Sequence, residues 1–213
     1  GFTVTGSDLQ PSEMTETLKK RGATILIGQD GSQIKSVHEQ QPVDWFVHSS
    51  ALKPDHPELV FAIENKLKTS KRDGFLNHLL AVLDLQMIAV AGTHGKTTTT
   101  GMLVWLFKQL GLPVSYSVGT SISFGAPAAY EPGSQYFVYE CDEFDKNFLQ
   151  YRPYISVVTS VDYDHPDTYP TAESYNEAFK QFASQSDRVL IWQHGANKIG
   201  LTASETTHVL PPE

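Results

Sequence analysis

The chain has 213 residues, of which 40% are hydrophobic and 19% are charged. Apolar positions are spread along its whole length, which excludes a disordered or fibrous protein and leaves room for about one or two globular domains. The 16 Lys and Arg against 24 Asp and Glu give a net charge of -8, and no basic run stands out. This balance argues against a general nucleic-acid or membrane surface.

The single cysteine, Cys141, excludes an intramolecular disulfide and a cysteine-rich metal cluster. A reducing compartment is therefore expected, and we predict a cytoplasmic location. The sequence has neither an apolar run of about 18 residues nor a secretory leader pattern. Because Gly1 already stands at the start of a strand-like segment, we expect a fragment that lacks its first βα unit.

The first third of the chain alternates strand-like and helical patterns. Strands are expected at residues 2–5, 24–27 and 43–47, and a helix at 11–21. This βαβ rhythm predicts a parallel sheet with crossover helices. We therefore predict an incomplete Rossmann-like domain at residues 1–84.

The rest of the chain repeats the same rhythm with longer elements. Strands are expected at residues 87–91, 136–139, 155–159 and 189–192, and helices at 97–110 and 172–183. The three tryptophans, Trp45, Trp105 and Trp192, lie in apolar runs and are expected in the core. These elements predict a second, also incomplete, α/β domain of the P-loop ATPase type at residues 85–213.

A glycine-containing loop joins a buried strand to an amphipathic helix. Its sequence is Gly92-Thr93-His94-Gly95-Lys96-Thr97-Thr98. In such a loop the backbone N–H groups and the helix N-terminus surround phosphate oxygens, Lys96 neutralises the β- and γ-phosphates, and the Thr97 hydroxyl can bind Mg²⁺. Val90 stands where the first glycine of the general G-x-x-x-x-G-K-T pattern is expected. We predict that the seven residues bind the phosphates of ATP, although His94 could equally fill a loop position without touching them.

This loop resembles the ATP-binding motif of the Mur ligases, the ATP-dependent amide-forming enzymes that build the peptide stem of peptidoglycan. Three further motifs resemble the L-alanine-adding members of that family. They are Gly6-Ser7-Asp8, Ser49-Ser50-Ala51-Leu52-Lys53 before Pro57-Glu58-Leu59, and Asp164-His165-Pro166-Asp167-Thr168-Tyr169. The resemblance runs in order from residue 1 to about 183. It implies a UDP-sugar-binding first domain, an ATP-binding central domain and a C-terminal domain that this chain lacks.

An acidic segment follows the strand at 136–139. Glu140 would therefore lie at the carboxyl end of a sheet strand, beside the phosphate loop. Mg²⁺ prefers oxygen ligands, and in the resembling family the first Glu of a Glu-x-Asp-Glu segment binds it, so the resemblance implies this role for Glu140. Glu143 and Asp145 are more simply explained as parts of a solvated acidic turn.

A histidine follows the strand at 155–159. The resemblance implies that the His165 imidazole completes a second Mg²⁺ site, with Asp164 orienting the ring. The family usually carries Asn where Ser160 stands. The polar contact made there is therefore expected to be shortened or bridged by water.

Five polar or small residues are candidates for substrate binding. Ser7 and Asp8, expected after the first strand, and Ser49 and Ser50, expected after the third, would line a UDP-sugar pocket at strand ends. Gly119 matches the position of a substrate-contacting turn in the family.

The resemblance implies an ATP-dependent ligase that joins L-alanine to UDP-N-acetylmuramate through an acyl phosphate. Lys96, Glu140 and His165 would stabilise the phosphoryl transfer, with ATP and Mg²⁺ as cofactors and no nucleic-acid or membrane partner. One alternative is a ligase that attaches a recovered tripeptide to the same acceptor. Others are a P-loop NTPase or kinase, which needs no amino acid, and a non-catalytic nucleotide-binding module. The fragment alone is not expected to complete the ligation.

Overall fold

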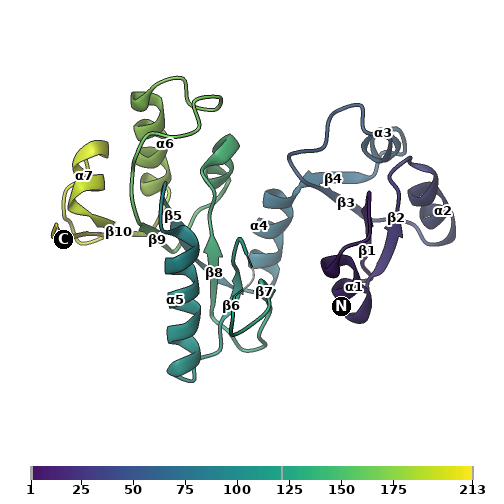
Figure 1. The fold of residues 1–213 in the computed structure, drawn as a ribbon, viewed down its shortest axis with the longest axis horizontal. Coiled ribbons are helices and arrows are strands. Elements are labelled where there is room, and N and C mark those ends of the chain that lie inside the picture. Colours follow the sequence, from purple (N-terminus) through teal and green to yellow (C-terminus); the bar gives the residue numbers. More distant parts are fainter. Residues whose placement is uncertain (1, 121, 213) are drawn as a thin grey trace. The chain divides into compact units, whose positions relative to one another are not determined.

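The computed structural model describes residues 2–120 and 122–212 and divides into two compact units, Gly1–Phe75 and Leu76–Glu213 (Figure 1). Both units are built from parallel strands that alternate with helices. The α/β class expected from the sequence is therefore confirmed. None of the helices in the described part combines the length and the hydrophobicity that crossing a bilayer requires.

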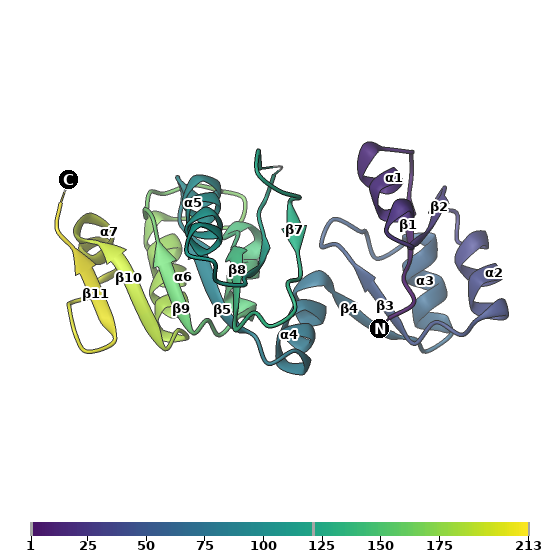
Figure 2. The ribbon, with the colours of Figure 1, turned by 90° about the horizontal axis from the view of Figure 1, so that it is seen from below.

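The first unit contains four strands and three helices, and a fourth helix leads into the second unit. Its elements are β1 (Thr5–Asp8), α1 (Glu13–Lys20), β2 (Thr24–Ile27), α2 (Ser32–Gln40), β3 (Trp45–His48), α3 (Pro57–Glu64) and β4 (Lys68–Lys71), followed by α4 (Arg72–Val82). The strands pair in parallel as β1 with β2 and β3 with β4, so they form two separate two-stranded sheets (Figure 2).

The first strand begins later than the sequence pattern predicts. It runs over Thr5–Asp8 rather than over residues 2–5, so Ser7 and Asp8 lie within β1 and not after it. The ladder with β2 pairs Thr5 with Thr24, whereas the apolar side chains of Phe2 and Val4 are more than half exposed. Backbone pairing, and not burial of an apolar pair, sets this strand.

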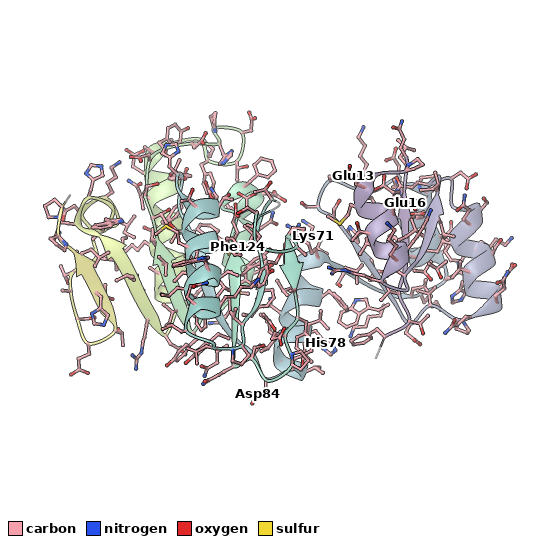
Figure 3. All side chains as sticks on the ribbon, turned by 60° about the horizontal axis from the view of Figure 1, so that its bottom comes forward. Glu13, Glu16, Lys71, His78, Asp84 and Phe124 are labelled. Atoms are coloured by element: carbon pink, nitrogen blue, oxygen red, sulfur yellow. The ribbon has the colours of Figure 1, made fainter. Side chains whose placement is uncertain are left out.

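Local signals account well for the helix α1. The Ser12 side chain accepts a hydrogen bond from the Thr15 N–H, and the Thr15 hydroxyl oxygen accepts one from the Ser12 N–H, which forms a capping box. Glu13 and Glu16 extend from the first turn, where the helix dipole favours negative charge (Figure 3).

The second unit is a larger sheet with helices on both faces. Its elements are β5 (Gln86–Ala91), α5 (Lys96–Gln109), β6 (Ser115–Ser117), β7 (Ala128–Ala129), β8 (Tyr136–Glu140), the 3₁₀ segment η1 (Phe144–Gln150), β9 (Ile155–Val158), α6 (Ala172–Ser184), β10 (Arg188–Trp192), α7 (Gln193–Ile199) and β11 (Thr207–Leu210). The strand order is β11-β10-β9-β5-β8-β6-β7, and β7 is antiparallel to β6. The central strand β5 therefore lies between β8 and β9, and the carboxyl ends of all three meet at one edge.

The side chains of β5 alternate between two hydrophobic clusters. Met87 and Ala89 face a cluster that includes residues of α6, η1 and α7, whereas Ile88 faces a cluster that includes Val104 of α5. Successive residues of a strand point to opposite faces, so a strand buried on both faces reads as a continuous apolar run. The apolar run of β5 is explained by this double burial.

The expectation that Trp105 and Trp192 lie in the core is wrong, because their side chains are 50% and 37% exposed. The buried residues of α5 are Thr100, Gly101 and Val104. These small side chains allow the helix to approach the sheet closely, and Trp105 is left on the outer side.

A stack of aromatic rings fills the space between η1 and α6. The Phe148 ring lies 4.8 Å from the ring of Phe182 and 5.1 Å from that of Phe179, and all three side chains are fully buried. Aromatic pairs at this spacing add to the free energy gained by burying their area.

We predict that Phe182→Ala lowers the free energy of unfolding by about 3–5 kcal/mol, because it leaves a cavity in this stack. Lys180→Ala, an exposed position on the same helix, should change it by less than about 0.5 kcal/mol. Urea unfolding followed by circular dichroism measures both. Equal effects of the two substitutions would contradict the assignment of this cluster as the core.

Candidate nucleotide and magnesium site

The phosphate loop is pressed against the carboxyl end of β9. Gly92 has φ +139°, and a Cβ atom there would overlap the Thr159 hydroxyl and lie 2.8 Å from the Ser160 nitrogen. Gly95 has φ +82° and is the N-cap residue of α5. Both positions require glycine, the first for close approach and the second for its left-handed backbone.

Two hydroxyl groups hold residue 94 of the loop in place. The Thr159 hydroxyl donates to the His94 carbonyl oxygen at 2.5 Å, and the His94 N–H donates to Ser160 Oγ at 2.8 Å. The contact at Ser160 is therefore direct, although a serine is shorter than the asparagine usual in the family. The His94 side chain itself is exposed.

Thr93 ties the loop to the segment that follows β9. Its hydroxyl donates to the Asp162 carbonyl oxygen at 2.7 Å and accepts from the Asp162 N–H at 2.8 Å. The Tyr175 hydroxyl lies 2.7 Å from the same Thr93 oxygen. These bonds hold the loop and the strand end together as one surface.

The Lys96 side chain lies inside the loop. Its Nζ donates to the Gly92 carbonyl oxygen at 2.7 Å and to Glu143 at 2.9 Å (Oε2) and 3.1 Å (Oε1). The Lys96 side chain is 16% exposed and that of Glu143 is fully buried. The expectation that Glu143 belongs to a solvated turn is therefore wrong. Its only sequence signal was its place three residues after Glu140.

Thr97 and Glu140 meet as a hydroxyl and a carboxylate at the loop. The Thr97 hydroxyl donates to Glu140 Oε1 at 2.7 Å, and the Gly119 N–H donates to Glu140 Oε2 at 2.7 Å. A Cβ atom on Gly119 would lie 2.8 Å from the carboxylate, so only glycine allows this approach. Oxygen donors from two elements thus converge as Mg²⁺ requires, and this donor set fits that ion.

His165 lies near Glu143, the carboxylate that contacts Lys96. Its Nε2 is 3.6 Å from Glu143 Oε1 and 3.9 Å from Asp164 Oδ2, and its backbone N–H donates to Asp164 Oδ1 at 2.7 Å. Donor atoms of Asp142, Glu143 and His165 lie within 4.8 Å of one another. This group, separate from the Thr97–Glu140 pair, could hold a second cation.

Two buried tyrosines support Glu143. The Tyr169 hydroxyl donates to the Glu143 carbonyl oxygen at 2.6 Å, and the Tyr175 hydroxyl, whose proton serves the shorter contact with Thr93, lies 3.4 Å from Glu143 Oε1. Burial, reinforced by the negative charge of Glu143, raises the pKa of both phenols well above the usual range. Both tyrosines therefore remain hydrogen-bond donors across the physiological range.

The substrate candidates of the first unit form contacts of their own. Ser7 donates to Glu58 Oε2 at 2.6 Å, and Glu58 is 3% exposed. Asp8 is exposed and accepts from a backbone N–H two residues on. Ser49 and Ser50 follow β3 and are exposed. Glu58 was not expected as a site residue, because a glutamate in the first turn of a helix usually only complements the helix dipole.

Comparison with known proteins identifies two family models along the chain. The model described as "Mur ligase family, catalytic domain" matches residues 1–82, and the one described as "Mur ligase middle domain" matches residues 90–207. The second covers more than half of the chain.

Two relatives with similar sequences carry the same protein name. The UDP-N-acetylmuramate--L-alanine ligase of Syntrophomonas wolfei is 40% identical over 185 residues, and that of Thermosynechococcus vestitus is 37% identical over 190 residues. The matches cover 87% and 89% of this chain but 38% and 39% of the relatives. The chain thus spans about two fifths of the length of these curated relatives.

Solved structures show the same fold. The UDP-N-acetylmuramate:L-alanyl-gamma-D-glutamyl-meso-diaminopimelate ligase from Neisseria meningitides superposes with a TM-score of 0.82 over 99% of this chain and 70% of that chain. The UDP-N-acetylmuramate-alanine ligase from Thermotoga maritima superposes with a TM-score of 0.79 over 97% of this chain and 46% of that chain. Both are 24% identical in sequence, so they support the fold alone.

We predict that Gly92→Ala destabilises the protein more than Gly133→Ala does. Gly133 also has a positive φ, +84°, but nothing lies near its missing Cβ, so its substitution should cost only about 1–2 kcal/mol of backbone strain. Gly92→Ala adds the overlap with Thr159 and should cost at least about twice as much. Thermal unfolding of the two variants measures the difference. Equal losses would show that the loop is free to move away from β9.

Proposed function

Because the chain belongs to the Mur ligase family, we propose that the protein is an ATP-dependent ligase that joins L-alanine to UDP-N-acetylmuramate. The observation that carries the proposal is the convergence of Lys96, Thr97 and Glu140 at the end of β5, in a chain 40% identical to a UDP-N-acetylmuramate--L-alanine ligase. A lysine, a hydroxyl and a carboxylate at one loop are the groups that phosphoryl transfer from ATP requires.

In the proposed reaction, a carboxylate oxygen of UDP-N-acetylmuramate attacks the γ-phosphorus of ATP. The bond from that phosphorus to the ADP oxygen breaks, and an acyl phosphate forms. The amine of L-alanine then attacks the acyl carbon, phosphate leaves with the electron pair of the broken bond, and the nitrogen loses a proton. The products are the amide, ADP and phosphate.

The residues of the second unit act on the first of these steps. The loop N–H groups and the Lys96 ammonium bind the β- and γ-phosphates, where negative charge moves as the phosphoryl group is transferred. Thr97 and Glu140 would hold Mg²⁺, and His165 with Asp142 and Glu143 would hold a second ion. Bound Mg²⁺ neutralises the repulsion between the substrate carboxylate and the triphosphate.

Residues of the first unit serve the other substrate. We propose that residues 1–84 bind the UDP-sugar through Ser7, Asp8, Ser49 and Ser50, and that residues 85–213 bind ATP. Gly119, which contacts Glu140, would border the substrate carboxylate. ATP and a nucleotide sugar as substrates place the reaction in the cytoplasm.

Incorporation of radiolabelled L-alanine into UDP-N-acetylmuramate tests the proposal, with the protein extended by any residues that flank these 213. We expect ATP-dependent formation of the L-alanine amide. Incorporation of tripeptide but not of L-alanine would identify a tripeptide ligase instead. ATP turnover that needs no amino acid would identify an NTPase or kinase, and retained ATP binding without any product would indicate a binding module.

We predict that Lys96→Ala lowers kcat/KM for amide formation by about 10²-fold or more, because the variant loses the cation that stabilises the transferring phosphoryl group. Lys108→Ala, near the other end of α5 and exposed, should leave kcat/KM within about twofold, since surface substitutions have small effects. Calorimetry of ATP binding to the same variants separates binding from chemistry. Unchanged activity of the Lys96 variant would remove the phosphate loop from the mechanism.

A further inference from the structure

We propose that Glu143 is a positioning residue that holds the Lys96 ammonium and competes with phosphate for it. The inference deepens the proposed function, on which it rests for the identity of the phosphate as that of ATP. When a nucleotide binds, Lys96 exchanges the Glu143 carboxylate for a phosphate oxygen.

The contacts of Lys96 leave no donor for a ligand. An ammonium group has three N–H donors. They are directed at the Gly92 carbonyl oxygen at 2.7 Å, the Thr93 carbonyl oxygen at 3.4 Å and the two oxygens of Glu143 at 2.9 and 3.1 Å. A phosphate oxygen can therefore bind Lys96 only when one of these contacts is released.

The carboxylate partner is far less free to move than the lysine. Glu143 is fully buried, its carbonyl oxygen accepts from Tyr169 at 2.6 Å, and its Oε1 lies 3.4 Å from the buried Tyr175 hydroxyl. Lysine, by contrast, is a compact charge at the end of a flexible four-carbon stem. Arrival of phosphate should therefore move the Lys96 head while Glu143 stays in place.

A buried carboxylate that loses its cation needs other partners. Glu143 keeps the Tyr175 hydroxyl, and the Nε2 of His165 lies 3.6 Å from its Oε1. The same carboxylate thus reaches two groups that the proposed reaction uses, Lys96 and His165. We infer that it sets the starting position of both.

The proposed role and a purely structural role predict opposite changes in the affinity for phosphate when Glu143 is replaced. Glu143→Gln keeps the shape of the side chain and one of its two acceptor oxygens, but it removes the charge that competes for Lys96. Affinity for a phosphate anion should therefore rise, whereas the rate of amide formation should fall because Lys96 and His165 lose their common anchor. A residue that only stabilised the fold would lower both quantities when replaced.

The test is calorimetric binding of pyrophosphate to this chain without Mg²⁺. Glu143→Gln should bind pyrophosphate about tenfold more tightly than the wild type, because Lys96 then binds the anion without giving up a charged partner. Glu177→Gln removes the same charge from an exposed position on α6 and should change the affinity by less than about twofold. In a Lys96→Ala background the gain from Glu143→Gln should disappear.

Equal or weaker pyrophosphate binding by Glu143→Gln would overturn the proposal, and so would a lack of binding to both proteins, because a released Lys96 must bind the anion. If Glu143→Gln does not fold, Glu143→Asp withdraws the carboxylate by one methylene and should also bind pyrophosphate more tightly than the wild type. Failure of both variants to fold would assign Glu143 a structural role only. A failed L-alanine ligation would refute the proposed function without altering these affinities.

Discussion

Parallel pairing of β5 with β8 and β9 is the constraint on which the site depends. The register places Val90 opposite Glu140 and Ala91 opposite Val158. Because all three strands run in the same direction, their carboxyl ends open at one edge of the sheet. The phosphate loop, the acidic segment and the segment after β9 therefore meet there, although up to about 70 residues of chain separate them.

Within this frame, one buried charge organises the surrounding residues. Glu143 contacts Lys96 from the loop, Tyr175 from α6 and His165 from the segment after β9. Burial of a carboxylate is costly unless it is paired and hydrogen-bonded, so these partners are required and not incidental. The pairing also makes the position of Lys96 sensitive to phosphate, because a phosphate anion offers the lysine an alternative partner to Glu143.

The first unit also contains a buried carboxylate, Glu58, that is paired with a polar side chain. Its candidate binding residues lie in the second half of β1 or directly after β3, and Ser7 is oriented by the buried carboxylate of Glu58. The proton of the Ser7 hydroxyl is thereby committed, and Gln29 Nε2 donates to its oxygen at 3.4 Å.

The sequence by itself determined the α/β class, the buried strand β5 and the glycine-containing loop that joins it to α5, because these depend on contiguous residues with a strong local pattern. It also indicated that Thr97 and Glu140 belong near each other, through their places at a helix start and a strand end. Only the tertiary structure decided that Glu143 is buried, that Trp105 is exposed and that the polar segment β4 is a strand. Each of these depends on which distant residues pack or pair with it, and local patterns carry no information about such partners.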